Sequence, residues 1–121
     1  MGSRKAVVEE YLEGFRRSDN ARVLALLTDD VVWDLPGFQH VSGSSHLEGK
    51  DAFRGEIENE AFVGSPILTV DRLVEEGDTV VALGTGETSL RTGERYRFAF
   101  CDVFTFRNDL IARVEAYVVT A

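Results

Sequence analysis

The chain has 121 residues, of which 44% are hydrophobic and 28% charged, and this composition is ordinary for one globular domain spanning residues 1–121. Its 13 basic and 21 acidic residues give a net charge of −8. An acidic surface repels nucleic-acid phosphates and anionic lipid heads, so we expect no nucleic-acid partner and no membrane partner.

The beginning of the chain and its cysteine content indicate where the protein works. The stretch MGSRKAVVEEYLEGF alternates charged and apolar residues and has no separate apolar signal region. No apolar run approaches the ~20 residues of a membrane helix. The single cysteine, Cys101, cannot form an internal disulfide, and we interpret it as a packed or interface thiol. We therefore expect a cytoplasmic protein.

Three helices are predicted in the first half of the chain. Val7, Tyr11 and Phe15 recur every four residues, which predicts an amphipathic helix over residues 4–17. Asp19 or Asn20 can cap a second, short helix. A short strand is predicted over 31–35, ended by Pro-Gly, and a loop rich in Gly, Ser and His over 37–49. A third helix follows at about 50–60.

Strands are predicted for the rest of the chain, from residue 66 onward. Short turns are expected at Gly77-Asp78, Thr92-Gly93 and Asn108-Asp109, as in an antiparallel meander. Gly-Thr-Gly at 84–86 lies inside a strand with no helix after it, so we interpret it as a bulge or a bend. The element order predicts an α+β fold, in which three N-terminal helices cover the concave face of a strongly bent, mostly antiparallel sheet.

The strand segment FAFCDVFTF, residues 98–106, places one acid on an aromatic face. Alternate side chains share a face of a strand, so Asp102 points the same way as four phenylalanines, Phe98, Phe100, Phe104 and Phe106. An ionised carboxyl would lose its water there. Either an arginine from a neighbouring strand pairs with it, or an apolar pocket keeps it neutral. Arg97 and Arg113 fall on the opposite face, which favours the pocket, and Arg91 or Arg95 near a strand end remains as the alternative partner.

Tyr11 is the expected partner of Asp102. The first helix packs over the concave interior, so the tyrosine hydroxyl and the carboxyl can converge in one apolar cavity. Two such donors aimed at one oxygen would stabilise an enolate or an alkoxide. The alternative is a core tyrosine with an arbitrary hydrogen-bond partner. For Trp33, lining a pocket and capping the core remain equally open.

Three stretches resemble a known family: AVVEEYLEGFRRSDNARVLALLTDDVVWDLPG, FAFCDVFTF and LIARVEAYVV. With them nearly the whole chain resembles the SnoaL-like, or ketosteroid-isomerase-like, branch of the NTF2-like superfamily. The resemblance implies a cone-shaped NTF2-like fold. That fold hosts isomerases, polyketide cyclases, dehydratases, epoxide hydrolases and binding domains, so it specifies function weakly.

The ketosteroid isomerases use a helix tyrosine and a neutral strand aspartic acid as donors, and an aspartate before a proline as the base. By resemblance Tyr11 and Asp102 match the donors, whereas Leu35 stands at the base position. Asp34 is adjacent but belongs to the other face of the strand. His40, His46 and Glu56 are further candidate bases. The arginine and two aspartates of the related epoxide hydrolases find no support, since the last strand presents only Val114, Ala116 and Val118 inward.

These observations predict a site without a cofactor and without a metal, because the spacing of His40, His46, Asp34 and Glu48 matches no established ligand pattern. We expect Tyr11, Asp102, Asp34 and His40 to be catalytic. The expected substrate-binding residues are Phe15, Trp33, Leu35, Phe53, Phe100, Phe104 and Val118.

Three functions remain open. The first is an isomerase, cyclase or hydrolase for a small hydrophobic molecule with a carbonyl or hydroxyl, of the steroid, polyketide or terpenoid class. The second is a non-catalytic binding domain with the same pocket and no base. The third is a dimerisation module whose cavity is filled by side chains. In each case we expect a homodimer through the outer face of the sheet, which carries Ala99, Cys101, Val103 and Tyr117.

Overall fold

The computed structural model describes residues 3–38, 40, 43–57 and 62–120. In chain order these residues form α1 (Arg4–Arg16), α2 (Asn20–Leu24), β1 (Leu27–Asp34), β2 (His46–Glu48), α3 (Lys50–Ile57), β3 (Phe62–Glu76), β4 (Thr79–Leu90), β5 (Arg95–Arg107) and β6 (Leu110–Thr120). The strands form one sheet in the order β2-β1-β6-β5-β4-β3. Only β1 and β6 pair in parallel; the other neighbours are antiparallel. The predicted α+β fold is confirmed.

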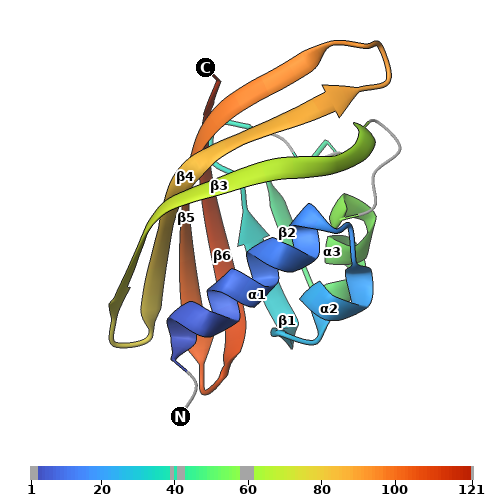
Figure 1. The fold of residues 1–121 in the computed structure, drawn as a ribbon. Coiled ribbons are helices and arrows are strands. Elements are labelled where there is room, and N and C mark those ends of the chain that lie inside the picture. The colour runs from blue at the N-terminus through green and yellow to red at the C-terminus, as the bar shows by residue number, and fades with distance from the viewer. Residues whose placement is uncertain (1–2, 39, 41–42, 58–61, 121) are drawn as a thin grey trace.

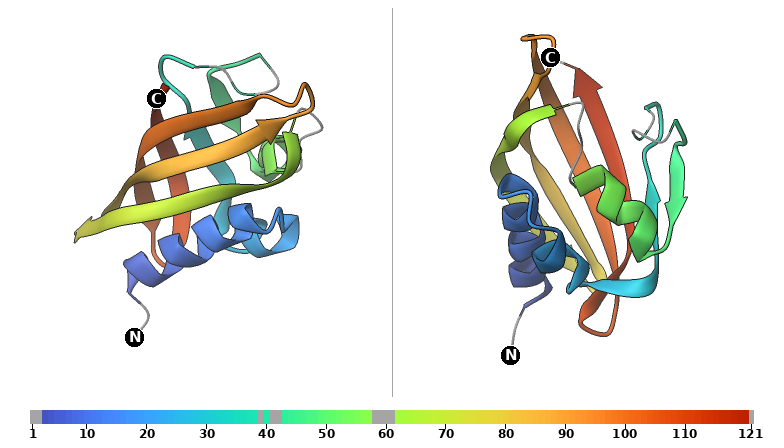
Figure 2. Two further views of the ribbon diagram at one scale, coloured as in Figure 1. Left: turned by 45° about the horizontal axis from the view of Figure 1, so that its top comes forward. Right: turned by 90° about the vertical axis from the view of Figure 1, so that its right-hand side faces the viewer.

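The helices lie on the concave side of the curved sheet. Helix α1 runs across the strands next to β3, and α3 packs against β1 near the other edge of the sheet (Figure 1). Helix α2 contacts both of these helices. Further views show helices and strands enclosing an interior between them (Figure 2). Side chains from both layers therefore meet in one interior.

Side-chain caps fix the starts of the first two helices. The hydroxyl of Ser3 accepts a hydrogen bond from the backbone N–H of Ala6, and the carboxylate of Asp19 accepts one from Arg22. Helix α1 then buries Val8, Tyr11 and Leu12 along one stripe, as its periodicity predicts. The predicted helices at 4–17 and after Asp19 are confirmed. The third ends at residue 57, and its expected extension to 60 lies outside the described residues.

Two strands differ from the sequence-based expectation. The expected loop over 37–49 contains the short strand β2, which pairs with β1 at the edge of the sheet. Three residues are too few to show an alternating pattern. Strand β3 begins at Phe62, ahead of Pro66, although Gly64-Ser65-Pro66 reads as a break. Its register against β4 shifts between Val63 and Ile67, and an irregular edge strand tolerates a proline.

The core fills the end of the interior near the β5–β6 turn. The largest fully buried side chains are Phe53, Phe104, Leu27, Ile111, Val8, Val23, Val31, Val80 and Val114. Several other inward side chains keep part of their surface accessible. These are Phe15, Trp33, Leu35, Phe98, Asp102 and Val118. The inward side chains are thus not all fully buried, and Asp102 is one of those that keep some accessible surface.

Candidate functional site

Asp102 sits in the middle of the inner face of the sheet. In register it lies between Ala82 of β4 and Ala116 of β6, and both alanines are buried. Alternate strand residues share a face, so all three side chains point inward. The carboxyl therefore has an alanine on each side in the sheet, and neither methyl group can donate a hydrogen bond to it.

The carboxyl of Asp102 is desolvated without compensation. Burial raises the pKa of Asp102 from 3.8 to about 7. Among the described residues no cation or hydrogen-bond donor reaches it. Arg95 and Arg97 instead bind Glu87, and Arg113 binds Asp34, all on the outer face. The salt-bridge alternative is therefore not what the structure contains.

Tyr11 reaches the same place from α1. Its side chain is 3% exposed, and its ring meets the edge of Phe104 at a centroid distance of 5.0 Å. Burial raises the pKa of the Tyr11 hydroxyl well above its usual value, and the nearby charge of Asp102 raises it further. The hydroxyl is therefore a neutral donor. Tyr11 and Asp102, the expected pair, both lie in the interior, near enough for the charge of Asp102 to act on the hydroxyl.

A series of packed aromatic rings runs from Tyr11 toward β1. Tyr11 packs on Phe15 with ring centroids 4.9 Å apart, and Phe15 meets Trp33 edge-on at 5.9 Å. Trp33 in turn stacks on Phe53 at 4.5 Å with an interplanar angle of 17°. Together these rings form one continuous wall of the interior, built from α1, β1 and α3.

The remaining predicted lining residues lie on the inner face of the sheet. Phe100 of β5 pairs in register with Val118 of β6, and Phe104 pairs with Val114. Leu35 directly follows β1. Extending the register of Asp34 with Glu115 by one residue places Leu35 beside Ala116, in the same row as Asp102. Leu35 and Asp102 therefore flank Ala116.

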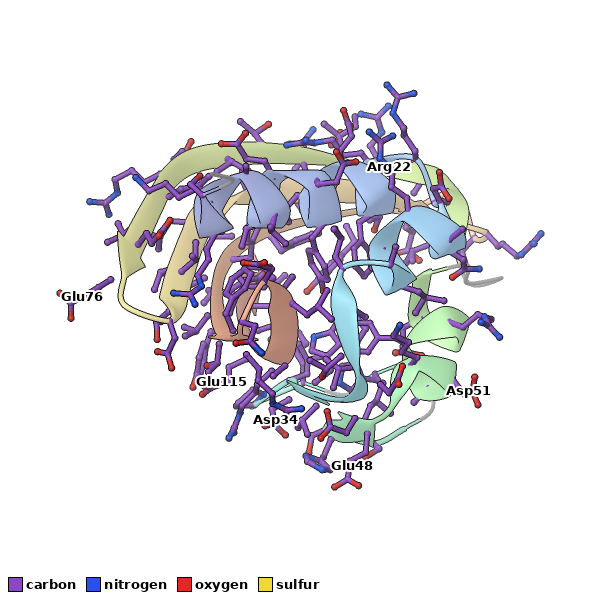
Figure 3. The ribbon with its side chains drawn as sticks, turned by 90° about the horizontal axis from the view of Figure 1, so that it is seen from below. Arg22, Asp34, Glu48, Asp51, Glu76 and Glu115 are labelled. Carbon is purple, nitrogen blue, oxygen red and sulfur yellow. The ribbon has the colours of Figure 1, made fainter. Side chains whose placement is uncertain are left out.

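Asp34 and His46 lie on the outer face and not in the interior. Asp34 is paired with Glu115 in register, and its carboxylate binds Arg113 at 2.7 Å and Nδ1 of His46 at 2.5 Å. The other imidazole nitrogen lies 3.0 Å from Glu48, and Glu48 and Asp34 together raise the pKa of His46. Figure 3 shows Asp34, Glu48 and Glu115 on the outside of the sheet. The strand parity that separates Asp34 from Leu35 thus removes Asp34 from the candidates for an interior base.

His40 is inside, but both of its nitrogens are engaged. Nδ1 lies 3.3 Å from Glu56 of α3, and Nε2 lies 3.3 Å from the backbone carbonyl oxygen of Trp33. The side chains of His40 and Glu56 are 1% and 8% exposed, and burial lowers the pKa of His40. The imidazole also packs on the Trp33 ring at 4.5 Å. His40 is placed to hold Trp33, and it presents no free nitrogen to the interior.

Some features of the site were not predicted from the sequence. Ala82 and Ala116 flank the carboxyl, and the His40–Glu56 pair lies behind Trp33. The alanines could have been found only with the strand register, which single-strand periodicity does not provide. Among the residues that the structure describes, no group of three or more His, Cys, Asp or Glu side chains is arranged to hold a metal ion.

Comparisons with known proteins agree with this architecture. The profile of the SnoaL-like domain matches residues 8–114. A search of the curated proteins returns no match. An NTF2-like protein of unknown function from Burkholderia pseudomallei is 28% identical, with a TM-score of 0.83 over 96% of this chain and 90% of that one.

Two further solved structures share the fold at lower identity. An LEH-like epoxide hydrolase from M. tuberculosis is 23% identical, with a TM-score of 0.80 over 96% of this chain and 82% of that one. TerC, co-crystallised with polyporic acid, is 21% identical, with a TM-score of 0.78 over 98% and 91%. No helix in the described parts of the chain is both long and apolar enough to cross a bilayer. With a family profile matching most of its length and an NTF2-like structure, the chain belongs to the SnoaL-like domain family of the NTF2-like superfamily.

Proposed function

We propose that this protein binds a small apolar molecule through a carbonyl or hydroxyl oxygen held by Tyr11 and Asp102, and that Asp102 transfers a proton on that molecule. The observation that carries the proposal is the carboxyl of Asp102, which burial holds at a pKa of about 7 beside a neutral tyrosine. A buried acid without a partner is costly, and such groups concentrate at functional sites.

The pattern of burial supports a pocket around this pair. Asp102 is strongly desolvated and yet partly accessible, which is what a group on the wall of an internal space experiences. The inner side chains Phe98, Val118 and Leu35 also keep part of their surface accessible. Their apolar surfaces fit a hydrophobic ligand with few polar atoms.

The proposed chemistry uses one carboxyl in two protonation states. Neutral Asp102 donates a hydrogen bond to the ligand oxygen alongside Tyr11. Ionised Asp102 takes a proton from the carbon next to a carbonyl, while Tyr11 donates to the oxygen that gains negative charge. The proton then returns from Asp102 to a different carbon, so no proton is gained or lost overall. A pKa of about 7 populates both states near neutral pH.

We assign both roles, hydrogen-bond donor and base, to Asp102 because no second base is available among the described interior residues. Asp34 and His46 lie outside, and Glu56 is engaged with His40. The proposal is thus an isomerase- or cyclase-type enzyme for a steroid, polyketide or terpenoid. Fold neighbours described as an LEH-like epoxide hydrolase and as co-crystallised with polyporic acid are consistent with small organic ligands in this fold.

A second candidate is a binding domain without catalysis. Leucine at position 35 favours it, because the isomerase pattern has its base there. The two functions share the pocket and differ only in whether Asp102 moves a proton.

Hydrogen exchange at carbon separates the two. A panel of apolar ketones in D₂O is followed by NMR for replacement of the hydrogens next to the carbonyl. We expect the wild type to accelerate exchange, and Asp102→Asn to lose ~10²-fold or more. Tyr11→Phe should lose ~10-fold or more, as expected for one oxyanion donor. Asp34→Asn, which removes a carboxyl on the outer face, should match the wild type.

Binding is followed in parallel by the fluorescence of Trp33, the only tryptophan of the chain. Binding with no exchange establishes the binding domain. If Asp102→Asn both binds and exchanges like the wild type, Asp102 has neither proposed role.

We further propose a homodimer through the outer face of the sheet. Tyr117 and Val119 of β6 are 42% and 66% exposed there, which is unusual for large apolar side chains. In register they continue into Cys101 and Ala99 of β5. Ion pairs of Arg113 with Asp34 and of Arg97 with Glu87 flank this patch, as the polar rim of an interface would.

A further inference from the structure

The position of Trp33 is fixed by contacts with three other rings and by a contact between its backbone carbonyl and His40. Its ring is stacked on Phe53, met edge-on by Phe15 and covered by the imidazole of His40. Its backbone carbonyl oxygen lies 3.3 Å from Nε2 of His40, whose Nδ1 lies 3.3 Å from Glu56. Three elements, α1, β1 and α3, together with the loop carrying His40, therefore define the orientation of one indole.

The indole nevertheless has an unused polar atom. Nε1 of Trp33 is buried and has no hydrogen-bond partner among the described residues. The same is true of Asn20 Oδ1, Thr28 Oγ1 and Thr88 Oγ1. A threonine hydroxyl can rotate toward a new partner, and an amide can be flipped, whereas an indole N–H is a pure donor fixed by its ring. A buried donor without an acceptor costs free energy that this fold has no evident reason to bear.

We propose that the indole N–H of Trp33 is a third hydrogen-bond donor of the site, and that the His40–Glu56 pair positions it. The ligand then carries a second oxygen, remote from the one held by Tyr11 and Asp102. This inference rests on the proposed function and narrows its ligand class to elongated molecules with two oxygens.

The register of the sheet sets the scale of that ligand. Trp33 pairs with Val114, whereas Asp102 pairs with Ala116, two residues further along β6. Asp102 and Trp33 are two strands apart. At ~4.8 Å per strand and ~3.3 Å per residue, the Cα atoms lie roughly 12 Å apart. Both side chains point into the same concave interior, so one elongated ligand with an oxygen near each end can contact both.

Access to the N–H requires a small movement. The Trp33 residue keeps part of its surface accessible, whereas Nε1 itself is covered. A ligand oxygen that reaches Nε1 displaces a neighbouring side chain, and the edge-on ring of Phe15 is the one in contact from α1.

Two ketones of one skeleton test the proposal: androstan-3-one, with one oxygen, and androstane-3,17-dione, with oxygens at both ends. Affinities are measured by calorimetry, so that the tryptophan can be replaced. We expect the wild type to prefer the dione by ~5- to 10-fold, as one hydrogen bond would give. Trp33→Phe removes the N–H and keeps an aromatic ring, so it should lose this preference and bind the monoketone nearly as the wild type does. Unchanged preference in a folded Trp33→Phe overturns the inference.

A second measurement does not depend on the folding of a variant. The chain has one tryptophan, so its indole gives a single ¹H–¹⁵N resonance. The dione should move this resonance downfield, as hydrogen bonding does, and the monoketone should leave it nearly in place. Equal shifts with both ketones contradict a contact to the second oxygen.

The positioning role of His40 has its own readout. In the wild type, the indole resonance should change with pH as His40 gains a proton, and this should happen below the usual range of histidine because burial lowers the pKa of His40. His40→Gln should lose both this pH dependence and the dione preference. If Tyr11→Phe and Asp102→Asn weaken both ketones while Trp33→Phe changes nothing, only this inference fails. If the wild type binds neither ketone, the steroid class fails together with it.

Discussion

Asp102 is an acidic residue buried on an apolar face, and its burial makes the stability of the protein depend on pH. Its pKa is raised from 3.8 to about 7 in the folded protein by burial. Between these pH values the folded state keeps a proton that the unfolded state has released. The contribution of this carboxyl to the free energy of unfolding is therefore fully present below pH 4 and is lost as the pH rises toward 7. The change corresponds to about 4 kcal/mol.

Asp102→Asn removes this pH dependence, since an amide has the shape of the protonated acid and cannot ionise. We expect the variant to exceed the wild type in free energy of unfolding by up to about 4 kcal/mol at pH 8, and to match it near pH 4. Urea unfolding of both proteins at the two pH values measures the difference. A difference that does not change with pH would show that Asp102 is solvated or paired.

Leu35 is the residue at which a base can be restored. It shares a row with Asp102 across Ala116, so its Cα lies two strand spacings, roughly 10 Å, from that of Asp102. Leu35→Asp should raise the rate of hydrogen exchange on a bound enone by ~10-fold or more, because a general base typically contributes ~10²–10⁴-fold.

The matched control is Leu35→Asn, which places a similar polar group there without a proton acceptor of that strength. Both variants should lose about 2 kcal/mol of stability through the polar group. An enone that binds to Leu35→Asp with no gain over Leu35→Asn would mean that position 35 does not face the ligand.

Strand alternation puts Asp102 on the inner face and the helical period puts Tyr11 on the buried stripe, because each residue belongs to a long element with a clear period. Neither pattern settles His40, which lies in a segment without periodicity and reaches the interior only through its contacts with Trp33 and Glu56. For Asp34 the alternation gave the correct face, and proximity to Leu35 in sequence was misleading about its position in space.

At the scale of elements, two glycines of β4 let it lie close to its neighbours. A Cβ at Gly84 would lie 2.1 Å from the backbone oxygen of Thr69 and 2.8 Å from the ring of Phe100. At Gly86 it would lie 2.2 Å from the ring of Phe98. The rings of β5 thus lie across glycines of β4 on the inner face. The register of β3 shifts between Val70 and Arg72, right beside Gly84, where a bend or bulge was predicted.

Gly84→Ala should lower the free energy of unfolding by about 2 kcal/mol or more, since a backbone oxygen cannot move aside as a side chain can. Gly55 in α3 is the control, because an added Cβ there meets nothing within 4 Å. Gly55→Ala should stabilise by up to about 1 kcal/mol through helix propensity. Thermal unfolding of both variants gives the comparison. Equal effects would mean that β3 and β4 are further apart than described.

Elements with strong local signals were predicted and weak ones were not. The helix at 4–17 and the three strand turns follow from periodicity and turn residues. Strand β2 has three residues and depends on pairing with β1, a non-local interaction that no local pattern encodes. The parallel pairing of β1 with β6, which closes the curved sheet and places Trp33 next to Val114, is likewise invisible in the sequence.

At the scale of the whole molecule, an apolar patch on the outer face of the sheet indicates that two copies of the chain pair there. The described apolar patch joins Val119 and Tyr117 to side chains of β5, β4 and β3, namely Ala99, Cys101, Val103, Leu83, Val81 and Val74. A patch of this kind across four strands is typical of a surface that pairs with a second copy.

Light scattering after gel filtration should therefore give twice the 13.4 kDa of one chain. Val119→Lys should shift the wild-type dimer toward monomer by ~10-fold or more in dissociation constant, since a charge replaces an apolar contact. Ala21→Lys, on an exposed helix residue away from this face, should leave it unchanged. A monomeric wild type at tens of micromolar, or insensitivity to Val119→Lys, would contradict this interface.

Titration of the Asp102 carboxyl by ¹³C NMR is the decisive measurement for the proposed site. The resonance is identified as the one that Asp102→Asn removes. The buried and unpaired environment predicts a pKa of about 7, so that both protonation states are populated near neutral pH. A pKa near 4, the ordinary value of an aspartate, would contradict the proposed site, because a carboxylate that is fully ionised at neutral pH has no proton to donate to a ligand oxygen.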